Sequence, residues 1–89
     1  MDRSEIIRQA DDIINNARAR QHGDVHSSFK AVAKLWSEIC GREVGAHEVC
    51  LMMIALKIMR AVNTPDHADH WRDIIGYAAL GAEISEAHD

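Results

Sequence analysis

The sequence has little of several residue types, and each shortage narrows the class of protein. Proline occurs once among 89 residues, and aromatic residues make up only 4%. No segment shows sustained alternation of apolar and polar residues, so the pattern does not indicate β-strands. The longest apolar run, Val49 to Leu56, is far shorter than the about 20 residues that a helix needs to cross a bilayer. We therefore expect a helical protein without a membrane partner.

The chain contains only two cysteines and more acidic than basic residues. Cys40 and Cys50 form no CxxC pair, and two cysteines exclude a cysteine-rich zinc site. The first residues are charged and amphipathic, unlike a signal peptide, so we expect reduced thiols and a cytoplasmic protein. The formal net charge of -4 disfavours duplex nucleic acid, because proteins bind it chiefly through clustered cations.

Apolar residues recur with the helical period in four segments. We expect helices over residues 4–18, from 27 or 28 to 40, over 46–61, and from 65 or 69 to 87. Ser27 or Ser28 would cap the second helix, and Gly41 would end it. Four helices with short connections predict an all-α protein, a small four-helix bundle that forms one domain over residues 1–89. A chain of this size buries only about 60–65% of its unfolded surface, so we expect it to be oligomeric.

The third and fourth helices carry the most informative packing patterns. Residues 49–56 are apolar on nearly every side, so this helix should be central and covered by the other helices or by a second subunit. Gly76 and Gly81 leave one side of the last helix nearly bare, which predicts close approach of another helix. The expected buried stripe of the last helix is Trp71, Ile74, Ile75, Ala78 and Ala82.

A cationic pair in the third helix is the first candidate for a binding site. Lys57 and Arg60 are spaced three apart and therefore share one face of the helix. They are either snorkelling side chains at the solvent edge or a pocket for phosphate oxygens, in which Arg60 supplies a bidentate fork.

The start of the last helix carries the second candidate group. Its members are His67, Asp69, His70, Asp73 and Tyr77. Asp69, Asp73 and Tyr77 are spaced by four, so they project from one face. Histidine and aspartate at such spacing form an acid–base pair or bind a divalent metal. The aspartates also suit structural ion pairs with Lys57 or Arg60, and both interpretations stay open.

The loop that enters the second helix is the third candidate. The residues concerned are Gly23, Asp24, His26 and Ser27. Free N–H groups at a helix start, together with hydroxyls and a glycine, attract anions. A plain helix cap requires the same residue types, so a structural role is the alternative. No complete phosphate-loop, GxSxG or HExxH motif accompanies any of the three groups.

Three segments together resemble a known family: HGDVHSSFKAVAKLW, VCLMMIALKIMR and HADHWRDIIGYAALGAE. They are similar to small phage and prophage proteins of unknown function, whose motifs read YGD…LW, MM..LK.AR and H.DNW.D..GYAA. The likeness covers roughly residues 20–84. His22 stands where the family often has an aromatic residue, and His70 stands where it often has Asn. The matching positions are Gly23, Asp24, Phe29, Trp36, Met52, Lys57, Arg60, His67, Asp69, Trp71, Asp73, Gly76 and Tyr77.

The last helix is also distantly similar to the MazG-like all-α nucleotide pyrophosphohydrolases. Those enzymes hold Mg²⁺ with an ExxE on one helix and an ExxD on another. In this sequence Glu38 has no acidic partner three residues away, and the third helix offers only Glu48 near its start. The magnesium cluster is incomplete, which counts against hydrolysis more than against nucleotide binding.

Three functional hypotheses follow from these groups and resemblances. The favoured one is a phage-encoded protein of the bacterial host cell that binds a nucleotide or nucleotide-derived molecule, such as a cyclic nucleotide immune signal. It would assemble with copies of itself and need no cofactor. One alternative is a MazG-like phosphohydrolase, in which Asp69 and Asp73 hold Mg²⁺ and Glu38 or Glu48 assists. The other is a protein–protein adaptor that uses the glycine- and alanine-rich side of the last helix.

Overall fold

The computed structural model describes residues 1–17 and 24–88. No strand occurs in these two ranges, which confirms the predicted all-α class. None of the described helices is long and apolar enough to span a membrane. The elements are α1 (Arg3–Asp12), a short π-helix η1 (Ile13–Ala17), α3 (Val25–Cys40), α4 (Ala46–Asn63) and α5 (Ala68–His88).

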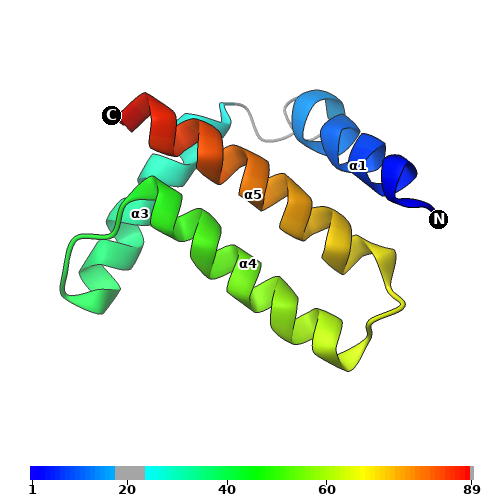
Figure 1. Ribbon diagram of the computed structural model, residues 1–89. Helices are drawn as coiled ribbons and strands as arrows, with labels where there is room; N and C mark the ends of the chain where they lie inside the picture. The colour runs from blue at the N-terminus through cyan, green and yellow to red at the C-terminus, as the bar shows by residue number, and fades with distance from the viewer. Residues whose placement is uncertain (18–23, 89) are drawn as a thin grey trace.

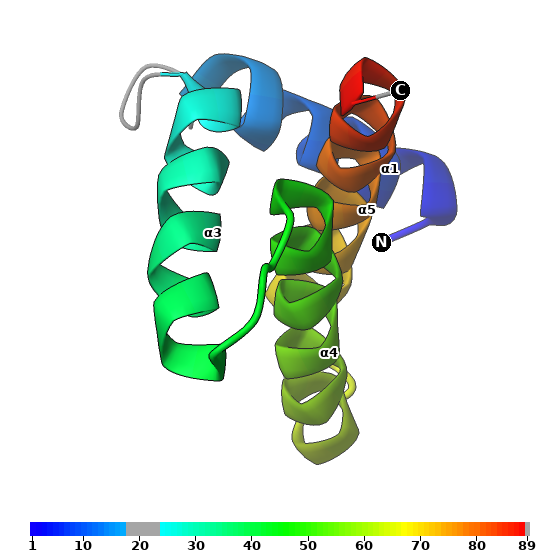
Figure 2. The ribbon, with the colours of Figure 1, turned by 90° about the vertical axis from the view of Figure 1, so that its left-hand side faces the viewer.

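The two longest helices, α4 and α5, run antiparallel and form a hairpin at the centre of the molecule (Figure 1). Helix α1 packs against α5, and α3 packs against α4. The two shorter helices therefore lie on different sides of the hairpin (Figure 2). This arrangement confirms the predicted small four-helix bundle within the described part of the chain.

An aspartate cap sets the start of α3. The Asp24 carboxylate accepts hydrogen bonds from the His26 N–H at 3.2 Å and from the Ser27 hydroxyl at 2.7 Å. The Ser27 bond is the main reason why the pKa of Asp24 lies below its ordinary value. Because aspartate is a strong N-cap, the helix starts at Val25 rather than at one of the two serines that follow. It ends as predicted at Gly41, whose φ of 70° is left-handed.

Helix α1 is shorter than predicted. Its α-helical part ends at Asp12 and continues as the wider η1, whereas one regular helix is expected to reach Arg18, which lies outside the described residues. Two asparagines in η1 donate side-chain hydrogen bonds to aspartates four residues earlier. The turn brings Ile14 against Gly76, where an added Cβ would lie 3.3 Å from Ile14 Cγ2. Helix α4 ends two residues later than predicted, and α5 begins within one residue of the second of its two predicted starts, at 69 rather than 65.

Two small clusters of buried side chains hold the hairpin to its neighbours. The first consists of Ala33, Val44 and Val49, with Val32, Trp36 and Met53 packed against it. The second consists of Cys50, Leu80 and Ile84, with Ile14, Val25, Phe29 and Ala46 packed against it. Burial raises the pKa of the Cys50 thiol to about 11, so this cysteine is a packing residue. Cys40 is exposed.

The buried side of α5 differs from the predicted stripe. Trp71, Ala78 and Ala82 are exposed, and the stripe prediction is wrong for these three. The cause is that α5 contacts α4 on one side and α1 on another, so no single stripe is covered. Between residues 68 and 86 of α5, where burial is described, the buried residues are Gly76, Tyr77, Leu80 and Ile84.

One side of α4 is not covered by the rest of the described chain. Its exposed apolar residues, which we call the α4 outer surface, are Leu51, Met52, Ala55, Leu56, Ile58, Met59 and Val62. The helix that the sequence predicts to be central is therefore covered on only one side within a single chain.

The close approach of α4 and α5 at Gly81 leads to a prediction. A Cβ added to Gly81 would lie 3.1 Å from the Cβ of Cys50. Gly81→Val should lower the free energy of unfolding by about 1–3 kcal/mol, although valine is the better helix former, because the two helices must move apart. Ala82→Val, at the exposed neighbouring position, is the matched control. Urea denaturation followed by circular dichroism measures the stability of both variants. If Gly81→Val is as stable as the unsubstituted protein, the close contact is contradicted.

Candidate functional site

The candidate groups of the third and fourth predicted helices lie side by side. Lys57 in α4 and Asp73 in α5 form an ion pair, with 2.9 Å between Nζ and Oδ2. The lysine side chain is 13% exposed and the aspartate side chain 23%. Water therefore screens this pair less than it screens a surface ion pair. The contact joins the two helices of the hairpin near their connecting turn.

His70 lies between this pair and the connecting turn. Its Nε2 is 2.8 Å from the Thr64 hydroxyl, and its ring centre is 5.0 Å from that of His67. Burial lowers the pKa of His70, and nearby His67, Lys57 and Arg60 lower it further. These surroundings favour the neutral imidazole over the imidazolium. Its Nδ1 atom is buried and has no hydrogen-bond partner among the described residues.

The remaining charged residues at this end of the hairpin differ in their surroundings. Arg60 is exposed, and its side chain forms no ion pair within the described residues. Asp69 lies 3.4 Å from His67 and also pairs with Arg72. Arg72 in turn donates to Gln9 of α1 at 2.7 Å. Asp69 and Arg72 therefore take part in contacts within the fold, whereas the guanidinium of Arg60 is open to solvent.

The predicted loop site at the start of α3 is engaged in local structure. Asp24 and Ser27 form the helix cap, and Gly23 lies outside the described residues. His26 Nε2 is 2.6 Å from Glu83 Oε1, near the carboxyl end of α5. The structure therefore shows Asp24 and Ser27 in a capping role, and anion binding by this loop stays a prediction.

A hollow of about 540 Å³ opens beside this loop, between α1, α3 and α5. Its lining includes apolar residues and three carboxylates, those of Asp11, Asp24 and Glu83. Negative charge at this density repels a phosphate group. The electrostatics at the start of α3 therefore disfavour the anion that the loop pattern suggests.

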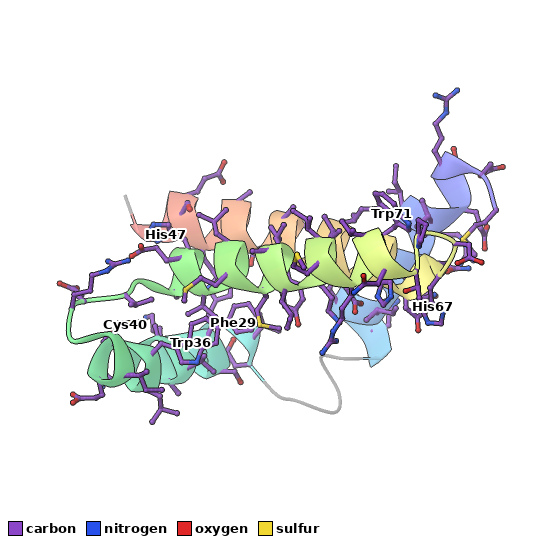
Figure 3. The ribbon with its side chains drawn as sticks, turned by 90° about the horizontal axis from the view of Figure 1, so that it is seen from below. Phe29, Trp36, Cys40, His47, His67 and Trp71 are labelled. Atoms are coloured by element: carbon purple, nitrogen blue, oxygen red, sulfur yellow. The ribbon has the colours of Figure 1, made fainter. Side chains whose placement is uncertain are left out.

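The loop residues and the Lys57–Asp73 pair do not form one site. Glu83, the partner of His26, is ten residues beyond Asp73, which is about 15 Å along the helix. Figure 3 shows the two ends of the hairpin: His67 lies at the turn, and Cys40 lies toward the opposite end. A ligand that contacts both groups would have to span about half the length of α5.

Tyr77 packs between helices. Its ring is buried and stacks on Phe29 of α3, with 6.2 Å between ring centroids and 25° between the planes. It also lines a hollow of about 210 Å³ together with Cys50. The geometry gives Tyr77 a packing role, although the sequence places it on the face of Asp69 and Asp73.

The acidic residues do not gather into a metal site within the described ranges. Glu48 accepts hydrogen bonds from the Gly45 N–H at 3.0 Å and from Arg42 at 3.4 Å, and the Gly45 bond is the main cause of its lowered pKa. It lies nine residues from Lys57, the partner of Asp73, which is about 14 Å along α4. The two aspartates of α5 therefore lack the carboxylate from α4 that a shared Mg²⁺ would need.

None of the predicted binding residues belongs to the α4 outer surface. Four of its members, Leu51, Ala55, Ile58 and Val62, are separated by four, three and four residues. This spacing is typical of a helix that pairs with another helix, and it is the signal from which this surface could be found in the sequence.

The chain belongs to a family described as a domain of unknown function, DUF6378, whose sequence profile matches residues 5–85. It is 38% identical over 76 residues to the Gene 55 protein of Mycobacterium phage L5, which covers 84% of this chain and 49% of that protein. It is 32% identical over 81 residues to the Gene 55 protein of Mycobacterium phage D29, which covers 91% of this chain and 54% of that protein. The chain thus spans about half the length of these relatives.

These relatives confirm the expected kinship with phage proteins of unknown function. They do not show the expected likeness to MazG-like enzymes, which stays a prediction. No solved structure matches the chain significantly.

The half-buried pair of Lys57 and Asp73 gives a prediction about stability. Asp73→Ala leaves the lysine charge without its partner and should lower the free energy of unfolding by about 1–3 kcal/mol. Replacing both residues, with Lys57→Met and Asp73→Leu, removes both charges and should recover much of that loss. Urea denaturation of the two variants measures the difference. A double variant less stable than Asp73→Ala alone would show that the pair does not act as a unit.

Proposed function

We propose that the chain is a protein-association module that acts through the α4 outer surface. The observation that carries the proposal is the exposure of seven apolar side chains on one side of one helix. Among them, Leu51 is 61% exposed, Ile58 50% and Val62 69%. Burying apolar surface is favourable by about 25 cal/mol per Å², so a partner that covers this side gains binding free energy. Continuous apolar patches of this kind mark interaction sites on soluble proteins.

The α4 outer surface contains no charged residue, which supports the proposal. Between Glu48 and the end of the helix, only Lys57 and Arg60 are charged. Lys57 pairs with Asp73 of α5, and Arg60 lies close enough to His70 to affect its pKa. A partner therefore need not remove water from a charged group in the middle of the contact.

The contact proposed here differs from the adaptor surface that the sequence suggests. The glycines of α5 already face neighbouring helices of the same chain: Gly76 faces Ile14 and Gly81 faces Cys50. Only the alanines of that side, such as Ala78 and Ala82, stay exposed, and they offer little apolar area. The α4 outer surface is the larger apolar surface and replaces the α5 side as the proposed contact.

Photo-crosslinking tests this association in bacterial cells. With p-benzoylphenylalanine in place of Ile58, irradiation should give a covalent adduct, because the position lies in the middle of the α4 outer surface. The same group in place of Arg3, which is exposed on α1, should give little adduct and serves as the control. A well-expressed, folded protein without a specific adduct from position 58 would contradict the proposal.

Nucleotide binding at the hairpin turn is a second candidate, and the surroundings of His70 favour it. Lys57 and Arg60 lie close enough to His70 to lower its pKa, while Asp73 acts in the opposite direction. The exposed guanidinium of Arg60 suits a phosphate group. A nucleotide or cyclic nucleotide held there fits a phage protein that captures a signal of its host.

Titration of the purified protein with nucleotides and cyclic oligonucleotides tests this second candidate. Removal of one charged contact to phosphate costs on the order of 1–2 kcal/mol, so Arg60→Ala should weaken binding about tenfold. Arg3→Ala, which removes an exposed charge on another helix, should leave affinity unchanged. If the titration shows no heat of binding, or if Arg60→Ala leaves the affinity unchanged, a site at the turn is contradicted.

A further inference from the structure

The apolar residues of α4 that point away from the chain follow a regular spacing. Leu51, Ala55, Ile58 and Val62 recur at intervals of four, three and four residues. In an α-helix this spacing gives a narrow, nearly straight stripe, and two such stripes pack together as in a short coiled coil. All four residues are exposed in the single chain.

The stripe is complementary to itself when a second copy lies antiparallel to it. A two-fold axis through the midpoint of the stripe places Leu51 of one helix opposite Val62 of the other, and Ala55 opposite Ile58. Each large side chain of the central layer then faces a small one, which lets the two helices approach to about 8–10 Å. A two-fold contact of this kind uses the same residues on both copies.

A hollow at the end of the stripe fits this arrangement. It has a volume of about 260 Å³ and an apolar lining of Ile58, Ala61, Val62, Pro65, Trp71 and Ile74. In the antiparallel register, Leu51 of the second copy lies opposite Val62 and therefore at the edge of this hollow. The side chain of that leucine is an apolar group that the hollow can receive.

The exposed area of the chain also favours such a partner. A monomeric protein of 9.9 kDa has a surface of roughly 5,200 Å² by the usual scaling with mass. This chain exposes 6195 Å², so its surface exceeds that of a typical monomer by roughly 1,000 Å². A standard protein interface takes about 800 Å² from each partner. The excess is enough for one such interface.

The absence of charge from the stripe removes an obstacle to pairing with a second copy. The residues of the α4 outer surface are all apolar, so two identical surfaces meet without repulsion between like charges. A partner chosen by charge would find no complementary group within the stripe.

We infer that a second copy of this chain covers the α4 outer surface, with the two α4 helices antiparallel and Leu51 of each opposite Val62 of the other. This inference rests on the proposed function and deepens it by naming the partner. The resulting core contains the α4–α5 hairpin of both copies.

Sedimentation velocity tests the dimer. The full chain should sediment with twice its mass, and Ile58→Glu should weaken dimerisation at least about 100-fold. Val62→Glu is a second variant in case the first fails to fold, as judged by circular dichroism. Leu35→Glu, at an exposed leucine of α3, is the matched control and should leave the dimer intact. A chain that stays monomeric at every concentration, or a dimer broken only by Leu35→Glu, overturns the inference.

Disulfide trapping tests the register. Cys40→Ser removes the exposed thiol, and burial makes Cys50 unreactive, so new cysteines can be read without background. Leu51→Cys and Val62→Cys proteins of distinguishable mass are mixed and oxidised. The antiparallel register predicts mainly the mixed disulfide between the two variants. Disulfides between two copies of the Leu51→Cys protein would show a parallel arrangement and overturn the register.

The photo-crosslinked adduct from position 58 separates this inference from the proposed function. An adduct with twice the mass of the chain supports both. An adduct with a different protein, and none with a second copy, leaves the association function standing and overturns the dimer. The lack of any specific adduct contradicts both.

Discussion

Helix α4 carries apolar side chains around most of its circumference, but the rest of the described chain packs against only one side of it. The packed side meets α5 at Gly81, where the missing side chain lets the helices come close to Cys50. The opposite side keeps seven apolar residues in water. With four short helices, the chain cannot surround α4 without help. This limit on the size of the core explains both the exposed surface and the proposed partner.

The polar residues near the hairpin turn form contacts within the fold. Lys57 and Asp73 are paired and half-buried, and Asp69 is held by its neighbours. Arg60 is the one cation of this group that faces solvent without an ion pair in the described part of the chain. The proposed association through α4 and the proposed ligand binding at the turn would use different residues, so the two proposals are compatible.

Helical periodicity predicts the class of fold and most helix positions, because each apolar stripe depends on local spacing. The juxtaposition of Lys57 and Asp73 also follows from two helices joined by a short turn. The buried residues of α5 cannot be predicted from helical periodicity, because α5 contacts two helices on different sides. The exposed Trp71 instead donates a hydrogen bond to the Pro65 carbonyl. The separation of Asp24 from the turn depends on how α3 docks, which no local pattern encodes.

The most direct measurement of the central claim is an isotope-filtered nuclear Overhauser experiment on a mixed sample. One half of the protein carries ¹³C-labelled methyl groups and the other half is unlabelled. The account predicts intermolecular signals between the methyl groups of Leu51 in one copy and Val62 in the other. A concentrated, folded sample without intermolecular signals from α4, or with signals from Leu35 of α3 instead, would contradict it.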